Sequence, residues 1–278
     1  MHASVNWQLS GFGDEIDPDP AVQVAVLQAL GARHIEVRSA WGTNVVDFSA
    51  EQRGELARVL RAHDMSVSAI ASPIGKVDIA LPVEHEVARL GRVIAAAHEL
   101  GARYIRIFSF YGTDGQSQHR DAVLERMRAL ANLAEREDVI LLHENEKDIY
   151  GDVPERILDI LESVGSPSLR AALDNANFVQ VGVRPFSDAY VVLRPFIDYL
   201  QVKDARSESG EVVPAGEGDG EVASTLEALR DDGYTGFASL EPHLTDLDAL
   251  GGPDGPSAFG AAARAFRRLA DQLGIGLE

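Results

Sequence analysis

The 278-residue sequence predicts an α/β protein, a single (β/α)₈ barrel with its active site at the carboxyl ends of the strands. Strand-like and helix-like segments alternate along the whole chain, and their number and total length are typical of such a barrel. Several strands also end in charged residues, at the edge of a parallel sheet where α/β proteins bind ligands. No linker or change in composition divides the sequence, so we expect residues 1–278 to form one domain.

A doubly wound open sheet is the structural alternative, because it also alternates strands with helices. Its dinucleotide-binding version needs a Gly-rich turn after the first strand, and the sequence has none there. The barrel is therefore the preferred interpretation.

The strands are predicted from short apolar runs bounded by polar or turn-forming residues. They lie near residues 7–12, 34–39, 65–72, 103–109, 139–142, 169–174, 199–203 and 236–241.

The helices are predicted from longer segments with start and stop signals. Ser49 and Gln52 resemble a capping box, Pro154 suits a first helical turn, and Gly31 and Gly101 end two segments. We expect helices near residues 21–30, from 49 onward, 83–100, 118–136, from 154 onward, 187–193, 222–231 and 256–273.

Composition excludes several classes of protein. The net charge of −19 repels nucleic acid, and no basic stripe offsets it. No apolar run approaches the ~18 residues of a membrane span, and the N-terminus lacks the features of a signal peptide. The absence of cysteine excludes disulfides and thiolate metal sites. We therefore expect a cytoplasmic protein that binds neither nucleic acid nor membranes.

Lysine is rare in this sequence, and its positions indicate function. The only lysines are Lys76, Lys147 and Lys203, and each follows a predicted strand. A compact, rotatable ammonium suits a substrate oxygen or a catalytic proton better than a rigid guanidinium does. A chance distribution is the alternative.

Acidic residues end three of the later strands, at Glu144, Asp174 and Glu241, and Gln201 lies in the strand between the last two. Because close carboxylates raise one another's pKa unless a cation neutralises them, a divalent metal would stabilise this set. Such hard oxygen donors favour Mn²⁺ or Mg²⁺ over Co²⁺ or Zn²⁺. For each acid taken alone, a helix cap or a salt bridge is the alternative.

Charged residues are also predicted inside the barrel. Strand alternation places Glu36 and Arg38 on one face of the second strand and Arg106 on the equivalent face of the fourth. The opposite faces are apolar and should meet the helices, so these charges should point inward and must pair or bind a ligand. An ion pair of Glu36 with Arg38 or Arg106 is the structural alternative.

Two histidines follow late strands. His143 should point away from Glu144, toward the helices, where a packed histidine is expected rather than a ligand. His243 lies two residues beyond Glu241 in the following loop, and we expect it to contact substrate.

Nine segments together resemble one known family. They are GFGDEI (11–16), IEVRSAWG (35–42), ASPIGK (71–76), YIRIFSFYG (104–112), LLHENEKDIYGD (141–152), LDNANFVQVG (173–182), QVKDA (201–205), PAGEGDG (214–220) and LEPHL (240–244). The sequence is similar over nearly its whole length to the xylose isomerase-like TIM barrel superfamily of sugar-phosphate isomerases and epimerases.

The resemblance implies one divalent metal held by Glu144, Asp174, Gln201 and Glu241. Relatives usually have histidine where this sequence has Gln201, which can still coordinate through its carbonyl as a weaker, neutral donor. Asn177 stands where many relatives have a second histidine that contacts substrate, and asparagine can make a similar hydrogen bond.

The resemblance also implies a mechanism, in which Glu144 and Glu241 move a proton through a metal-stabilised enediolate of a carbohydrate or keto-sugar. Return of the proton to the opposite face of the same carbon is epimerisation, and return to the neighbouring carbon is isomerisation. The expected substrate contacts are Glu36, Arg38, Lys76, Arg106, Glu146, Asn177, Lys203, Glu217 and His243.

Three other functions remain open at this stage. A metal-dependent dehydratase or lyase acting on a sugar or cyclitol would use the same residues. A non-catalytic sugar-binding barrel would have lost its centre at Gln201. Abasic-site nucleases share the barrel but use several zinc ions and many histidines, which this acidic sequence does not match.

We expect a small-molecule carbohydrate as the partner, and a homodimer or homotetramer.

Overall fold

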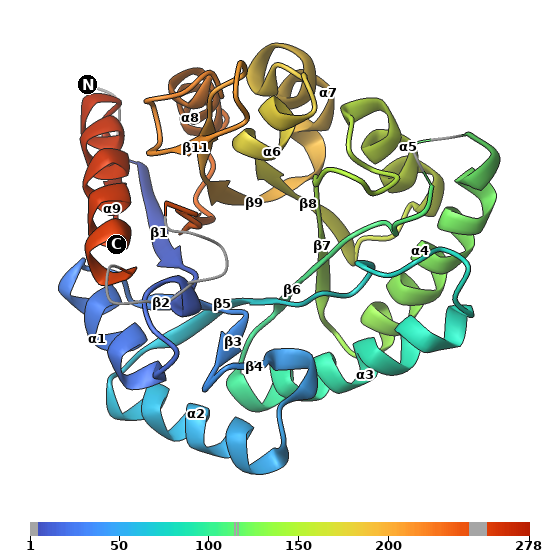
Figure 1. The fold of residues 1–278 in the computed structure, drawn as a ribbon, viewed down its shortest axis with the longest axis horizontal. Coiled ribbons are helices and arrows are strands. Elements are labelled where there is room, and N and C mark those ends of the chain that lie inside the picture. The colour runs from blue at the N-terminus through green and yellow to red at the C-terminus, as the bar shows by residue number, and fades with distance from the viewer. Residues whose placement is uncertain (1–4, 114, 116, 245–254) are drawn as a thin grey trace.

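The protein is described by a computed structural model over residues 5–113, 115, 117–244 and 255–278. Parallel strands form a ring inside a layer of helices (Figure 1). The ring strands are β1 (Val5–Gly11), β2 (His34–Val37), β5 (Ser66–Ala71), β6 (Tyr104–Ile107), β7 (Ile140–Glu144), β8 (Leu169–Asp174), β9 (Ile197–Val202) and β12 (Phe237–Leu240). A parallel bridge between Phe12 and Glu36 joins the two ends of the ring. The predicted (β/α)₈ barrel is confirmed.

The helices cover the outside of this ring in chain order. They are α1 (Pro20–Ala29), α2 (Ala50–Ala62), α3 (Val83–Leu100), α4 (Arg120–Arg136), α5 (Pro154–Val164), α6 (Asn175–Gln180), α7 (Val191–Leu193), α8 (Val222–Asp231) and α9 (Gly255–Gln272). The bounds of α3 and α8 agree with the prediction. The capping box of α2 is also present, since the backbone N–H of Gln52 donates to Ser49 Oγ at 3.1 Å and that of Ser49 to Gln52 Oε1 at 3.0 Å.

The segment between β8 and β9 differs from the prediction of one helix near residues 187–193. A short helix, α6, begins directly after β8, and a π-helical turn at Pro185–Tyr190 precedes α7. The Asp174 side chain causes the early start, because it accepts the backbone N–H of Asn177 at 2.9 Å and so caps α6. This helix was not predicted, because Asp174 both ends a strand and caps the next six residues, which are too few for a periodic pattern.

Short elements fill the connections. They are the hairpins β3 (Ser39–Ala40) with β4 (Thr43–Asn44) and β10 (Asp204–Ala205) with β11 (Val212–Val213), the 3₁₀ turns Gly13–Glu15, Val45–Asp47, Ser117–His119 and Arg194–Phe196, and β13 (Ile275–Leu277). Strand β13 pairs with β1 outside the ring. None of these elements has enough residues to give a periodic sequence pattern.

Strand alternation separates an apolar outer face from a partly polar interior, as predicted. Ile35 and Ile105 belong to the large core between ring and helices. Inside the ring, Tyr104, Tyr199 and Phe237 pack with ring centroids 5.6–6.3 Å apart. The aromatic layer closes the interior, so the polar residues nearer the carboxyl ends lie over a packed floor.

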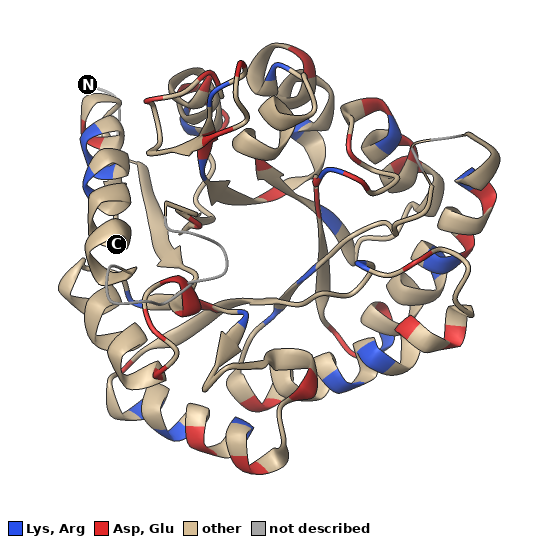
Figure 2. Ribbon diagram, viewed as in Figure 1, with Lys and Arg blue, Asp and Glu red and all other residues tan. Residues whose placement is uncertain are grey.

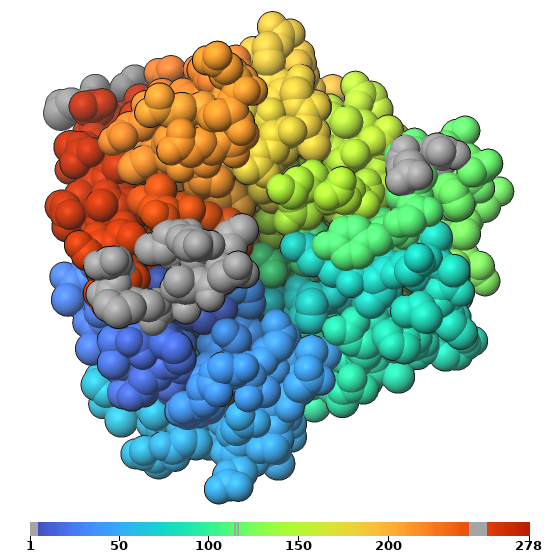
Figure 3. Space-filling view, viewed as in Figure 1, coloured from blue at the N-terminus to red at the C-terminus, as the bar shows by residue number. Residues whose placement is uncertain are grey.

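Charged residues occur both on the outer helices and at the strand ends around the centre of the barrel (Figure 2). In the space-filling view, segments from distant parts of the sequence border a recess near the centre (Figure 3). Across the described ranges, no helix is both long and apolar enough to span a membrane.

Gly75 offers a test of how the loop after β5 is built. Its φ is +86°, and a Cβ there would lie 2.1 Å from the carbonyl oxygen of Phe108. Gly42 has a similar φ of +69° with no atom within 4 Å of the added Cβ. We expect Gly42→Ala to lower the unfolding free energy by about 1–2 kcal/mol, from backbone strain alone. Gly75→Ala should cost a further ~1–3 kcal/mol because of the clash. Urea unfolding of the two variants measures this difference, and equal losses would contradict it.

Candidate active site

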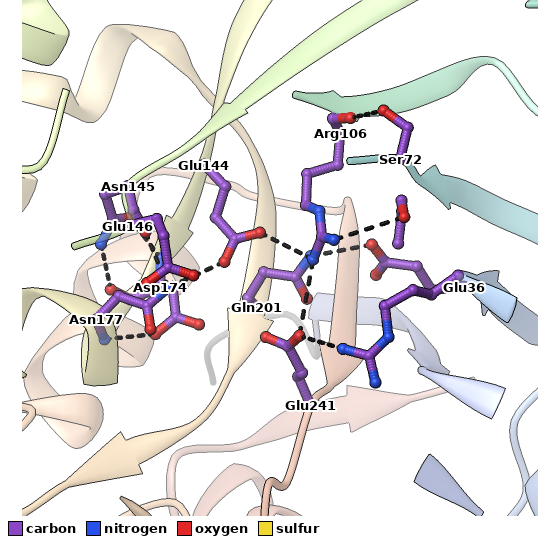
Figure 4. A network of polar contacts seen from close by, with 12 residues as sticks. Glu36, Ser72, Arg106, Glu144, Asn145, Glu146, Asp174, Asn177, Gln201 and Glu241 are labelled. Atoms are coloured by element: carbon purple, nitrogen blue, oxygen red, sulfur yellow. Dashed lines mark hydrogen bonds and ion pairs between the residues drawn. The ribbon is translucent and has the colours of Figure 1, made fainter. Parts of the chain in front are cut away.

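Three buried carboxylates lie together at the carboxyl ends of ring strands (Figure 4). Glu144 ends β7, Asp174 ends β8 and Glu241 follows β12, and each is at most 3% exposed. One oxygen of each lies within 4.8 Å of the others. The structure thus brings together the three acids that the strand ends predicted. Their mutual repulsion requires compensating cations.

Two buried cations compensate the acids directly. Lys203 Nζ lies 3.0 Å from Asp174 Oδ2 and 3.0 Å from Glu241 Oε2. Arg106 Nη1 lies 3.1 Å from Glu144 Oε2 and 3.7 Å from Glu241 Oε1. Glu241 therefore contacts both cations, while Glu144 and Asp174 each contact one.

A third cation reaches the centre from the second strand. Arg38 Nη1 lies 3.1 Å from Glu241 Oε1, and its Nε donates to Asp14 Oδ2 at 2.8 Å. Glu15 joins the same group, because its carboxylate lies 3.4 Å from Arg38 Nη2 and 2.9 Å from His243 Nε2. The loop after β1 therefore helps to fix both Arg38 and His243.

Two phenyl rings contact three of the cations. The Arg38 and Arg106 guanidinium carbons lie 4.8 and 5.3 Å from the ring centre of Phe12. Arg106 and Lys76 lie 4.9 and 4.2 Å from the ring centre of Phe108. These cation–π contacts help to hold like charges near one another; Arg106 is buried, whereas the Lys76 side chain is 30% exposed.

Hydrogen bonds also orient Glu144, Asp174 and one of the lysines, Lys76. Asn177 Nδ2 donates to Glu144 Oε1 at 3.0 Å, and Asn145 accepts the backbone N–H of Asp174 at 2.9 Å. Lys76 Nζ donates to Glu146 Oε2 at 3.0 Å. Asn177 and Glu146, both predicted to contact substrate, thus also position neighbouring side chains.

Glu36 lies deeper in the barrel and is fully buried. It accepts hydrogen bonds from Tyr199 OH at 2.9 Å and from Gln201 Nε2 at 3.0 Å. Among the described ion pairs Glu36 has none, so the alternative of a Glu36 ion pair with Arg38 or Arg106 is wrong: both arginines are engaged by other acids. The carbonyl oxygen Oε1 of Gln201 is buried and has no hydrogen-bond partner in the described part of the chain.

The environments of the two glutamates push their pKa values apart. Burial raises the pKa of Glu144 to about 8, although Arg106 opposes this. Burial also raises the pKa of Glu241, but Lys203 and His243 outweigh it and hold the pKa well below its usual value. Burial likewise raises the pKa of Asp174 to about 6 against the effect of Lys203. A proton in this centre therefore resides on Glu144 rather than Glu241.

The pKa values of His143 and His243 are likewise shifted in opposite directions by their surroundings. Burial lowers the pKa of His143 to about 4, and the ring lies against Gly151 as a packed, neutral histidine. Burial also lowers the pKa of His243, but Glu241 outweighs it and raises the pKa to about 9.

Two cavities share Lys76, Glu146 and His243 in their linings, and the smaller one reaches two of the three central acids. The smaller, about 160 Å³, is also lined by Arg38, Arg106, Glu144 and Glu241, with Asn44, Ala71 and Pro73 completing the wall. The larger, about 410 Å³, is within the usual range for small-molecule sites. Its other lining residues are Lys147, Asn177, Gln180, Lys203, Glu211, Val212 and Leu244. All three lysines of the sequence therefore border one cavity.

Two expected contacts line neither cavity: Glu36, which lies deeper in the barrel, and Glu217. Glu217 is exposed, and its carboxylate lies 3.9 Å from Arg268 of α9. Asp14, Glu15 and Tyr199 also belong to the site, although they were not predicted from the sequence. Two features of the sequence could have indicated them. An acidic pair follows the first strand, and a tyrosine lies two residues before Gln201, on the same face of its strand.

The donor set fits a divalent cation. The three carboxylates each offer an oxygen within 4.8 Å of the others, and the partnerless carbonyl of Gln201 adds a neutral oxygen. Oxygen donors of this kind suit hard cations such as Mg²⁺ and Mn²⁺.

Known proteins resemble this chain in sequence and in fold. The family model described as "Xylose isomerase-like TIM barrel" matches residues 24–270. A 2-epi-5-epi-valiolone 7-phosphate 2-epimerase of Actinoplanes sp. is 31% identical over 220 residues, which cover 77% of this chain and 78% of that protein.

Two solved structures illustrate the fold. The IOLI protein with a bound zinc atom has a TM-score of 0.76 at 15% identity, over 96% of this chain and 99% of the other. The 3-keto-D-glucoside 4-epimerase YcjR from E. coli has a TM-score of 0.73 at 14% identity, over 96% of this chain and 100% of the other.

The raised pKa of Glu144 predicts a loss of stability at alkaline pH. A carboxyl whose pKa rises on folding stabilises the protein at low pH, and this contribution is lost as pH rises through the folded pKa of about 8. Between pH 7 and 9 the metal-free protein should lose ~1 kcal/mol from this group, or about 2–4 °C in Tm. Calorimetry of the wild type and Glu144→Gln, with chelator present, measures it. An unchanged pH dependence in Glu144→Gln would count against this assignment.

Proposed function

This chain belongs to the xylose isomerase-like TIM barrel family, and we propose that it is a divalent-metal-dependent epimerase or isomerase of a carbohydrate or keto-sugar. The observation that carries the proposal is the pair of glutamates, Glu144 and Glu241, which line one small cavity from different strands. Two carboxyl groups converging on one space are what proton removal and return at a single carbon require.

The metal would be held by Glu144, Asp174, Gln201 and Glu241, with Mn²⁺ or Mg²⁺ preferred and Co²⁺ or Zn²⁺ as alternatives. Once bound, it would polarise a substrate carbonyl and acidify the adjacent C–H bond. The zinc atom of the IOLI protein, which shares the barrel, supports a metal in this fold.

The protein's own groups then carry the proton. One glutamate takes it from the carbon beside the carbonyl, and the other returns a proton to the opposite face of that carbon. The composition of the substrate is unchanged and its configuration is inverted. Arg106, Lys76 and Lys203 would bind the substrate oxygens on which negative charge develops.

Epimerisation is preferred over isomerisation because the Actinoplanes relative is named as a 2-epimerase. Elimination of a leaving group after the first proton transfer would make the protein a dehydratase or lyase, and the same experiment separates the two. Cytoplasmic location and assembly as a dimer or tetramer stay predictions from the sequence.

Glu241→Gln tests the proton-transfer role. The variant should keep the fold, and turnover should fall by at least about 10²-fold, because an amide cannot accept the proton. The proton-transfer step is measured directly as exchange of substrate hydrogen for solvent deuterium. The substrates tested are keto-sugars and ketone-bearing cyclitol phosphates, and NMR detects the exchange.

Glu227→Gln, which removes an exposed carboxylate on α8, is the matched control and should exchange as the wild type does. Full deuterium exchange in Glu241→Gln would exclude Glu241 as a proton carrier. Release of a dehydrated product by the wild type would favour the lyase.

A further inference from the structure

The orientation of the Gln201 side chain is fixed from one side only. Its Nε2 donates to Glu36 Oε1 at 3.0 Å, whereas its Oε1 is buried with no hydrogen-bond partner in the described residues. Gln201 lies beside Asp174 in the register of β8 and β9, and Figure 4 shows its amide between Glu36 and Glu241. One end of the amide thus faces Glu36 and the other faces the acidic centre.

Glu36 is itself anchored within the barrel. Its second oxygen accepts Tyr199 OH at 2.9 Å, and that hydroxyl lies 2.9 Å from Ser68 Oγ. Ser68 in turn lies 2.6 Å from Ser10 Oγ, so the network reaches β1. Glu36 is fully buried and cannot turn toward water.

The chemistry of Glu36 decides which end of the amide points to the centre. Both oxygens of Glu36 accept hydrogen bonds, one from Tyr199 OH and one from Gln201 Nε2, so the NH₂ group of Gln201 is the end that suits this neighbour. The carbonyl oxygen then points away from Glu36, toward the side on which the acids Glu144, Asp174 and Glu241 lie (Figure 4). The reverse orientation would let the NH₂ group donate to those acids, but it would set the carbonyl against Glu36.

The observed orientation leaves a carbonyl oxygen unpaired beside acceptors, which is unfavourable unless a cation lies between them. We infer that Glu36 is a positioning residue, which fixes the Gln201 amide so that its carbonyl oxygen serves as the fourth ligand of a divalent cation. This inference rests on the metal site of the proposed function. Glu36 then orients a metal ligand, the Gln201 side chain, and does not make the substrate contact expected from the sequence.

A double-mutant cycle on metal affinity tests the inference without substrate. Binding of Mn²⁺ alone is measured by titration calorimetry for the wild type, Glu36→Gln, Gln201→Leu and the double variant. A glutamine at position 36 can face either end of the Gln201 amide, so the carbonyl is no longer held. We expect Glu36→Gln and Gln201→Leu each to weaken Mn²⁺ binding by about tenfold, the range seen when groups that orient metal ligands are removed.

The double variant separates orientation from charge. If Glu36 acts through Gln201, the double variant should bind Mn²⁺ as Gln201→Leu does. If Glu36→Gln weakens binding equally in both backgrounds, Glu36 acts only through its negative charge and the inference is overturned. Glu86→Gln, which removes another buried carboxylate outside this centre, is the control and should leave the affinity unchanged.

Tyr199→Phe provides a second variant in case Glu36→Gln does not fold. It keeps the Glu36 charge but removes the hydroxyl that anchors it, so Mn²⁺ binding should weaken several-fold, and only while Gln201 is present. Unchanged affinity would contradict the inference. If the wild type itself binds no Mn²⁺, both the inference and the metal-dependent function fail, whereas Mn²⁺ binding that ignores position 36 overturns the inference alone.

Discussion

The burial of three carboxylates at one end of a barrel is the constraint on which the rest of the site depends. Glu144, Asp174 and Glu241 cannot remain ionised together without nearby positive charge. In the structure Lys203 and Arg106 provide it at 3.0–3.7 Å, with Arg38 as a third contact of Glu241. Removing one partner from such a network would leave an uncompensated buried charge, so its members depend on one another.

The distribution of cations around the acids is uneven, and this unevenness suits proton transfer. Among the described residues, Glu241 contacts Lys203, Arg106, Arg38 and His243, whereas the ion-pair partner of Glu144 is Arg106. The two glutamates consequently differ in their hold on a proton while lining the same cavity. The loop after β1 contributes to the difference, because Asp14 and Glu15 fix Arg38 from outside the centre.

Much of this arrangement could be predicted from the sequence, because parallel strands end on one side of a barrel and alternate their faces. Those two rules place Glu144, Asp174, Glu241 and Arg106 near one point. They do not determine which cation pairs with which acid, since that depends on side-chain reach: Arg38 extends to Asp14 and Glu241 rather than to its strand neighbour Glu36. Short elements such as α6 were also not predicted, because six residues are too few to show a hydrophobic periodicity.

The central claim is that the acids and the Gln201 carbonyl are arranged around one cation position. A crystal structure of the protein soaked in Mn²⁺, with anomalous differences measured near the manganese edge, tests it most directly. The account predicts one peak per chain, with Glu144, Asp174, Gln201 Oε1 and Glu241 at coordination distance and Lys203 displaced from Asp174. An empty centre with Lys203 still between Asp174 and Glu241, or a peak without Gln201 Oε1 as a ligand, would contradict it.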